Sequence, residues 1–112
     1  MYETRSFTGS ADGLANHLDA AITGGSVSAS LESAGEFSIG DARMIVRTYE
    51  RYSFAGGNRV SLNVSILAVG DQLEVALSTA GGSEVMFWKV NIFGEAAFMD
   101  KAVDAVDSFS GL

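Results

Sequence analysis

Four of the seven basic residues of this chain gather in one short stretch. They are Arg43, Arg47, Arg51 and Arg59. In an extended strand the first three share one face, Tyr49 lies between two of them, and Arg59 follows just across a Gly56-Gly57 turn. Guanidinium groups match carboxylates and phosphates, so this arginine stripe predicts an anion-binding surface. The alternative is a solvated face on which the arginines pair with Glu32, Glu50 or Glu74.

A second candidate site lies near the start of the last predicted helix, where Trp88 and Phe93 precede Glu95. A carboxylate in a first helical turn stabilises the helix dipole, which is one role for Glu95. The other role is a polar group at the mouth of a pocket lined by Phe87, Trp88 and Phe93. Phe98 and Met99 would either line this pocket or fill the core, and a small apolar ligand would enter there.

The motifs of known catalytic and metal sites are missing from the sequence. His17 is the only histidine, lacks a partner at helical spacing, and is expected to be an exposed helix residue. No Gly-x-Ser-x-Gly elbow occurs, and there is no cysteine to act as nucleophile or zinc ligand. Pairs of surface carboxylates leave acid–base chemistry formally open. We expect no metal, no cofactor and no enzymatic activity.

The composition indicates one folded domain spanning residues 1–112. A hydrophobic fraction of 47% is too apolar for disorder, yet no apolar run approaches the roughly 20 residues of a membrane-spanning helix. The net charge of −7 and pI near 4.4 should repel nucleic acid and anionic membrane. The first residues also lack the pattern of a signal peptide, so we expect a cytoplasmic protein.

The elements that would position these residues centre on a three-stranded meander from Ala42 to Thr79, joined by glycine turns. Apolar and polar residues alternate most clearly in its middle strand. The residues of this strand and the next that are expected to face the helices are Val60, Leu62, Val64, Ile66, Leu73, Val75 and Leu77. The arginines, with Ile45, Tyr49, Leu67 and Val69, are expected on the opposite face.

Apolar spacing predicts helices over about Ala11–Thr23, with Ser10 as N-cap, and Gly94–Phe109. Tyr2–Phe7 reads as a first strand. Another strand alternates through Val27, Ala29 and Leu31, and it either continues through a bulge at Ala34-Gly35 or stops and restarts. Val85–Trp88 is a short strand or an irregular plug. The predicted fold class is α+β: a single twisted antiparallel sheet in the order β-α-β-β-β-β-α, with both helices packed on one face.

This order of elements resembles the helix-grip and TATA-binding-protein-like group of folds. The run Phe87-Trp88-Lys89-Val90-Asn91-Ile92-Phe93-Gly94-Glu95, followed by an amphipathic helix, resembles a small bacterial family of unknown function. The resemblance implies a fold and no activity. Related folds bind apolar ligands, proteins or nucleic acid.

Two functional hypotheses follow from these features. The first is a non-enzymatic domain that binds a small apolar or anionic ligand at the Trp88 end or on the arginine stripe. The alternative is a protein-interaction or structural module that forms a homodimer through its exposed sheet face. Partners under these hypotheses are a small molecule or a protein, and neither nucleic acid nor membrane.

Overall fold

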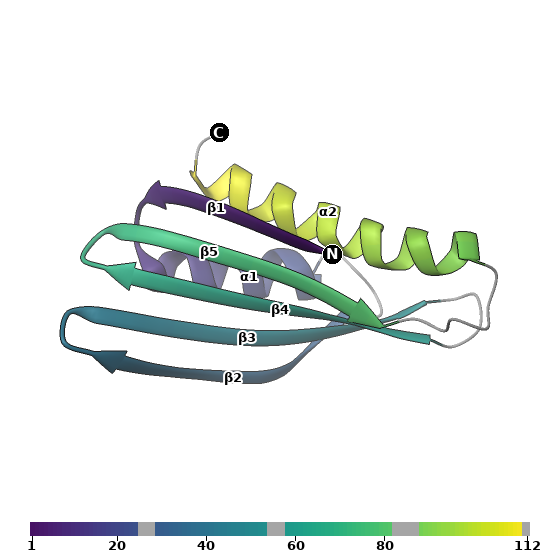
Figure 1. Cartoon of the computed structure of the whole chain (residues 1–112), viewed down its shortest axis with the longest axis horizontal. Coiled ribbons are helices and arrows are strands. Elements are labelled where there is room, and N and C mark those ends of the chain that lie inside the picture. The colour runs from purple at the N-terminus through teal and green to yellow at the C-terminus, as the bar shows by residue number, and fades with distance from the viewer. Residues whose placement is uncertain (25–28, 54–57, 82–87, 111–112) are drawn as a thin grey trace.

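A computed structural model describes residues 1–24, 29–53, 58–81 and 88–110, with residues 53, 58 and 88–94 described by their backbone alone. The elements follow the predicted order (Figure 1). They are β1 (Tyr2–Thr8), α1 (Ala11–Gly24), β2 (Ala29–Ile39), β3 (Ala42–Ser53), β4 (Asn58–Val69), β5 (Gln72–Gly81) and α2 (Trp88–Ser110).

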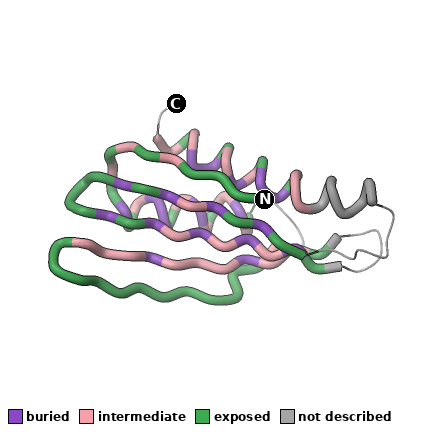
Figure 2. Tube along the Cα trace, in the orientation of Figure 1, coloured by how far each residue is buried: buried purple, intermediate pink, exposed green. Residues whose placement is uncertain are grey.

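The strands form one five-stranded antiparallel sheet in the spatial order β1-β5-β4-β3-β2. In Figure 1, α1 lies behind this sheet and α2 runs along its β1 side, and the face toward the viewer, here called the open face, is uncovered. The predicted α+β class and the helix-covered antiparallel sheet are therefore confirmed. The two edges of the sheet are β1 and β2, and β2 is exposed along nearly its whole length (Figure 2).

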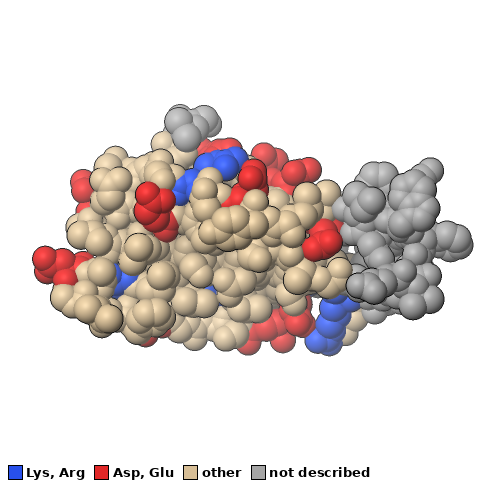
Figure 3. Space-filling view, viewed as in Figure 1, with Lys and Arg blue, Asp and Glu red and all other residues tan. Residues whose placement is uncertain are grey.

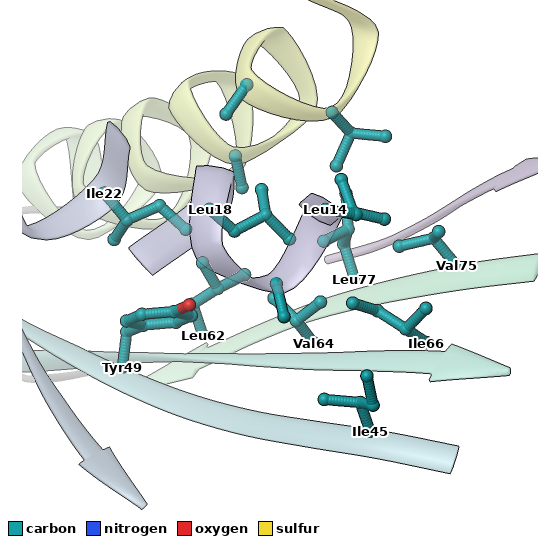
Figure 4. Packing of buried hydrophobic residues seen from close by; sticks show 14 of the residues in the cluster. Leu14, Leu18, Ile22, Ile45, Tyr49, Leu62, Val64, Ile66, Val75 and Leu77 are labelled. Atoms are coloured by element: carbon teal, nitrogen blue, oxygen red, sulfur yellow. The ribbon is translucent and has the colours of Figure 1, made fainter. Parts of the chain in front are cut away.

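The core lies between the helices and the sheet. Alternate residues of β4 and β5 are buried against one face each of α1 and α2, as period-two strands and period-3.6 helices require. In Figure 4 the strand side chains point toward α1. All seven predicted helix-facing residues are buried. The largest fully buried side chains include Tyr49, Phe98, Leu14, Leu18, Ile22, Leu62, Ile66, Leu73 and Leu77.

Local signals explain where the elements begin and turn. Ser10 caps α1 as predicted, because its Oγ accepts a hydrogen bond from the Gly13 amide at 3.0 Å. The β2–β3 and β4–β5 hairpins turn at Gly40-Asp41 and Gly70-Asp71. The two glycines have φ values of 55° and 61°, a conformation that tight two-residue hairpins require and other residues rarely adopt.

The predicted bulge lies at a different place in β2. The strand continues through to Ile39, but its pairing with β3 shifts between Leu31 and Ser33, rather than at Ala34-Gly35. The extra residue is Glu32, and it reverses the alternation of side chains beyond it. Leu31 therefore faces the helix side, whereas Phe37 and Ile39 face the open side. Val27 lies outside the described residues.

The last helix is longer than predicted. It begins at Trp88, so the expected start near Gly94 is wrong and Trp88 belongs to α2. The remainder of the predicted Val85–Trp88 strand or plug lies outside the described residues. Glu95 consequently lies about two turns into α2 and not at its start.

Candidate functional site

The arginine stripe lies on the helix-covered side of the sheet, which corrects the predicted placement on the open face. Residues directly opposite each other in an antiparallel pair share a face. Ile45 pairs with Ile66 and Tyr49 with Leu62, and all four are buried beneath the helices. Arg43, Arg47 and Arg51 share this parity. Arg43 and Arg47 lie beside α1, and Arg51 lies beside α2.

Arg43 is neutralised by two carboxylates. Its NH1 and NH2 groups donate to the two carboxylate oxygens of Asp12 at 3.1 and 2.6 Å, and its Nε donates to Glu36 at 2.7 Å. The hydrogen bonds and charge of Arg43 hold the pKa values of Asp12 and Glu36 below their usual range. All three nitrogens of this guanidinium therefore donate to carboxylates, and the solvated, ion-paired alternative fits Arg43.

Arg47 and Tyr49 share one carboxylate on α1. The phenol of Tyr49 donates a hydrogen bond to Asp19 Oδ1, and Arg47 Nε lies 3.4 Å from the same oxygen. Burial and the neighbouring carboxylate raise the pKa of Tyr49, because both disfavour the phenolate. These contacts fasten the second half of α1 to β3 and leave Tyr49 inside the core.

The other two arginines of the stripe are separated by the sheet itself. The Arg51 guanidinium lies 5.4 Å from the ring centre of Phe98, on the helix side. Arg59 lies on the open face, pairs with Glu50 at 2.8 Å, and stacks over Tyr52. The structure therefore brings Arg43, Arg47, Tyr49 and Arg51 together and leaves Arg59 on the opposite face.

Two of the residues expected at the proposed Trp88-end pocket belong to the core. Phe98 and Met99 are 0% and 2% exposed and form part of the core. Phe87 and the side chains of Trp88 and Phe93 lie outside the described part of the chain. Glu95 is half-buried, and its Oε1 lies 3.7 Å from the amino group of Met1.

An open pocket of about 500 Å³ lies at the far end of the sheet, beside the start of α1. Its lining includes Ser10, Asp12, Arg43, Gly70 and Asp71. Arg43 is already bound to carboxylates here. Among the described residues, no group of three or more His, Cys, Asp or Glu side chains could hold a metal ion.

His17 differs from its predicted exposed position. It lies between the helices, where its Nε2 is 3.1 Å from Ser108 Oγ and its ring contacts Phe109. The amphipathic spacing of each helix could not reveal this contact, because it depends on how the two helices pack side by side.

The open face carries a cluster of exposed apolar side chains at its hairpin end. Two rows of paired residues cross β2, β3 and β4 here. One row consists of Phe37, Met44 and Leu67, and the other of Ile39, Ala42 and Val69. Four of these six, here called the open-face patch, are exposed: Phe37 by 61%, Ile39 by 81%, Leu67 by 37% and Val69 by 50%. The exposure of Leu67 and Val69 agrees with their predicted position. Phe37 and Ile39 were missed, because only the bulge at Glu32 turns them outward.

Most charged side chains lie around the margins of the open face, and few lie on the face itself. In Figure 3 the middle of the sheet is formed by uncharged residues, and acidic and basic groups gather near its margins. Glu74 is the charged neighbour in the Leu67 row, and it accepts a hydrogen bond from Ser6. By contrast, α2 presents Asp100, Asp104 and Asp107 on its solvent side. The open face is thus the less charged side of an acidic molecule.

Comparison with known proteins supplies a family and no activity. No described helix is long and apolar enough to cross a membrane. No curated protein and no solved structure is significantly similar to the chain, so the likeness to helix-grip and TATA-binding-protein-like folds stays a prediction. A family model described as "Family of unknown function (DUF6054)" matches residues 2–110, and the chain therefore belongs to that family.

Proposed function

We propose that this protein is a non-enzymatic interaction module that forms a homodimer through the open face of its sheet. The observation that carries the proposal is the open-face patch, in which Phe37, Ile39, Leu67 and Val69 form neighbouring rows without an intervening charge. Single exposed apolar side chains are common, but contiguous ones mark interaction surfaces. Burying one such side chain fully contributes roughly 1.5–3 kcal/mol, so the patch supplies the anchors that interfaces require.

The charge distribution supports a second copy as the occupant. Each chain carries a net charge of −7, so two copies repel each other when acidic surfaces meet. A two-fold contact through the open face opposes two uncharged patches and keeps the acidic α2 helices on the outside of the dimer. Because the same surface is used twice, such a contact needs only to complement itself.

The small-ligand hypothesis receives less support from the same geometry. The guanidiniums of Arg43, Arg47 and Arg59 already meet carboxylates of this chain, which would compete with an added anion. Phe98 and Met99 fill the core where an apolar ligand would have to enter. An interaction surface therefore accounts for more of the described residues than a ligand site does.

Sedimentation equilibrium of the purified chain and of a patch variant tests the proposal. Wild type should dimerise, and the double variant Leu67→Ser with Val69→Ser should be monomeric or bind itself at least about ten-fold more weakly. Its circular dichroism should be unchanged, since both side chains are exposed. Leu31→Ser is the matched control, because it removes an exposed leucine from the other side of the sheet and should leave the dimer intact.

Two results would overturn the homodimer. One is a wild-type chain that stays monomeric at the highest concentration that can be measured. The other is a patch variant that dimerises as tightly as wild type, which would place the contact elsewhere on the molecule.

A further inference from the structure

The outer edge of β2 is a second surface of the sheet, which borders the open-face patch at Phe37 and Ile39. We propose that this edge accepts an extended basic segment of a partner protein, which adds to the sheet as a sixth strand beside Ser33–Ile39. In such β-augmentation, main-chain hydrogen bonds hold the segment and alternate side chains select it.

The main chain of β2 is open to a partner over a long stretch. β2 spans 11 residues, and all except Ala29 are exposed. On its inner side it pairs with β3, and no other described backbone segment hydrogen-bonds to it. An edge strand of this kind presents a row of unpaired N–H and C=O groups. The bulge at Glu32 interrupts the regular ladder, so Ser33–Ile39 is the stretch that a straight added strand can follow.

The alternation of β2 side chains predicts which sequence an added strand would carry. Beyond the bulge, Gly35, Phe37 and Ile39 face the open side, while Ala34, Glu36 and Ser38 face the helix side. An added strand has the same alternation, so its open-side residues lie beside Phe37 and Ile39 and favour apolar types. Its helix-side residues lie beside Glu36 and favour lysine or arginine.

Local charge selects a basic partner over a second copy of this chain. Glu32 and Glu36 lie on β2 and Asp41 in the turn that follows it. Two arginines of β3 pair with this stretch: Arg43 is held by Asp12 and Glu36, and Arg47 lies 3.4 Å from Asp19. Two β2 edges would bring four glutamates together in one ladder, and inward-pointing charges of this kind discourage edge-to-edge pairing. A basic strand would instead place positive charges beside these glutamates. The net charge of −7 would also attract it over a long range.

The other edge of the sheet lacks this pattern. β1 spans seven residues, and its open side carries Tyr2, Thr4, Ser6 and Thr8 instead of paired aliphatic and aromatic groups. On its helix side Arg5 forms an ion pair with Asp107 of α2 at 3.0 Å. At β1 a basic, alternating strand therefore meets neither the exposed apolar residues Phe37 and Ile39 nor the two glutamates, Glu32 and Glu36, that it meets at β2.

Amide hydrogen exchange measured by NMR, with a synthetic peptide of alternating lysine and valine as the probe, tests this inference. The protein is the Leu67→Ser, Val69→Ser variant, so failure of the peptide to bind is distinguishable from failure of the homodimer proposal. Saturating peptide should slow exchange at alternate amides of Ser33–Ile39. Two control peptides, one with glutamate in place of lysine and one with the lysines and valines in separate blocks, should not.

Variants of β2 then test the two sides of the strand. Glu36→Lys and Phe37→Ser should each weaken peptide binding by about ten-fold, whereas Glu3→Lys on β1 should change it little. Thermal melting of each variant checks that it is folded. The inference is overturned if the alternating peptide protects no amide of β2, if the block peptide binds equally well at that edge, or if both β2 variants bind the probe as wild type does.

Discussion

Tyr49 is a buried side chain whose hydroxyl group makes a specific hydrogen bond. It is 0% exposed, and its phenol donates to Asp19 beside Arg47. Removing the hydroxyl leaves a carboxylate at the edge of the core without one of its donors. We expect Tyr49→Phe to lower the free energy of unfolding by about 1–2 kcal/mol at neutral pH. Urea denaturation would measure this loss, and Tyr52→Phe on the open face is the exposed control.

The raised pKa of Tyr49 predicts the alkaline limit of the fold. Folding favours the neutral phenol, so the contribution of Tyr49 is fully present below its usual pKa of 10.0 and is lost as pH rises above that value. The stability difference between wild type and Tyr49→Phe should therefore narrow above pH 10. Absorbance of the phenolate should show Tyr49 ionising only as the protein unfolds, and ionisation in the folded state would contradict this.

The ion pairs of Arg43 should make the stability of the protein depend on pH in the acid range. It lowers the pKa values of Asp12 and Glu36, so its contribution exists when both carboxylates are charged and is lost as pH falls below their usual values of 3.8 and 4.5. Arg43→Met should lower the Tm slightly at neutral pH, as exposed ion pairs do, and the difference from wild type should close in acid. Arg51→Met is the control, because the described contact of Arg51 is the Phe98 ring, and its effect should persist in acid.

Among the elements, β2 shows how one residue decides which surface a strand presents. The bulge at Glu32 places Leu31 on the helix side and Phe37 on the open side, although both numbers are odd. Removing Glu32 should restore a regular ladder without changing the register of Ser33–Ile39. We expect this shortened protein to fold with Phe37 still exposed, as NMR contacts between Phe37 and Met44 would show. Its straighter edge should also self-associate more readily.

The elements themselves and the buried faces of β4 and β5 followed from the sequence, but the exposed faces of β2 and β3 did not. Period-two alternation shows which residues of a strand share a face, and β4 fixes its buried face because the other side carries Arg59, Ser61, Asn63 and Ser65. β3 has no such contrast. Ile45 and Tyr49 alternate with Met44 and Val46, so both faces are part apolar, and only pairing with β4 identifies the buried one.

The candidate site was harder to predict for the same reason. The arginines attract attention as charges, yet their partners on α1 are distant in the sequence, and no local pattern pairs Asp12 with Arg43 or Asp19 with Arg47. The open-face patch depends on a bulge whose position the serine- and glycine-containing β2 sequence leaves open. Long-range pairing therefore supplied what periodicity could not.

Over the whole molecule, one net charge acts in opposite directions on the two proposed contacts. Two copies at −7 each repel, although their open-face patches are uncharged, whereas a basic strand at the β2 edge is attracted. Added salt screens both effects, because the Debye length falls to about 10 Å at 0.1 M. Raising NaCl from about 0.02 M to about 0.3 M should therefore strengthen the homodimer and weaken binding of the lysine–valine peptide.

This opposite salt dependence separates the two contacts in one protein preparation. Sedimentation equilibrium gives the dimer dissociation constant, and fluorescence anisotropy of a labelled peptide gives the peptide dissociation constant, each along the same salt series. A homodimer that weakens with salt would indicate ion pairs across the contact, such as Arg59 of one copy with Glu50 of the other, instead of an apolar patch. A peptide whose affinity does not change with salt would show that Glu32 and Glu36 do not select it.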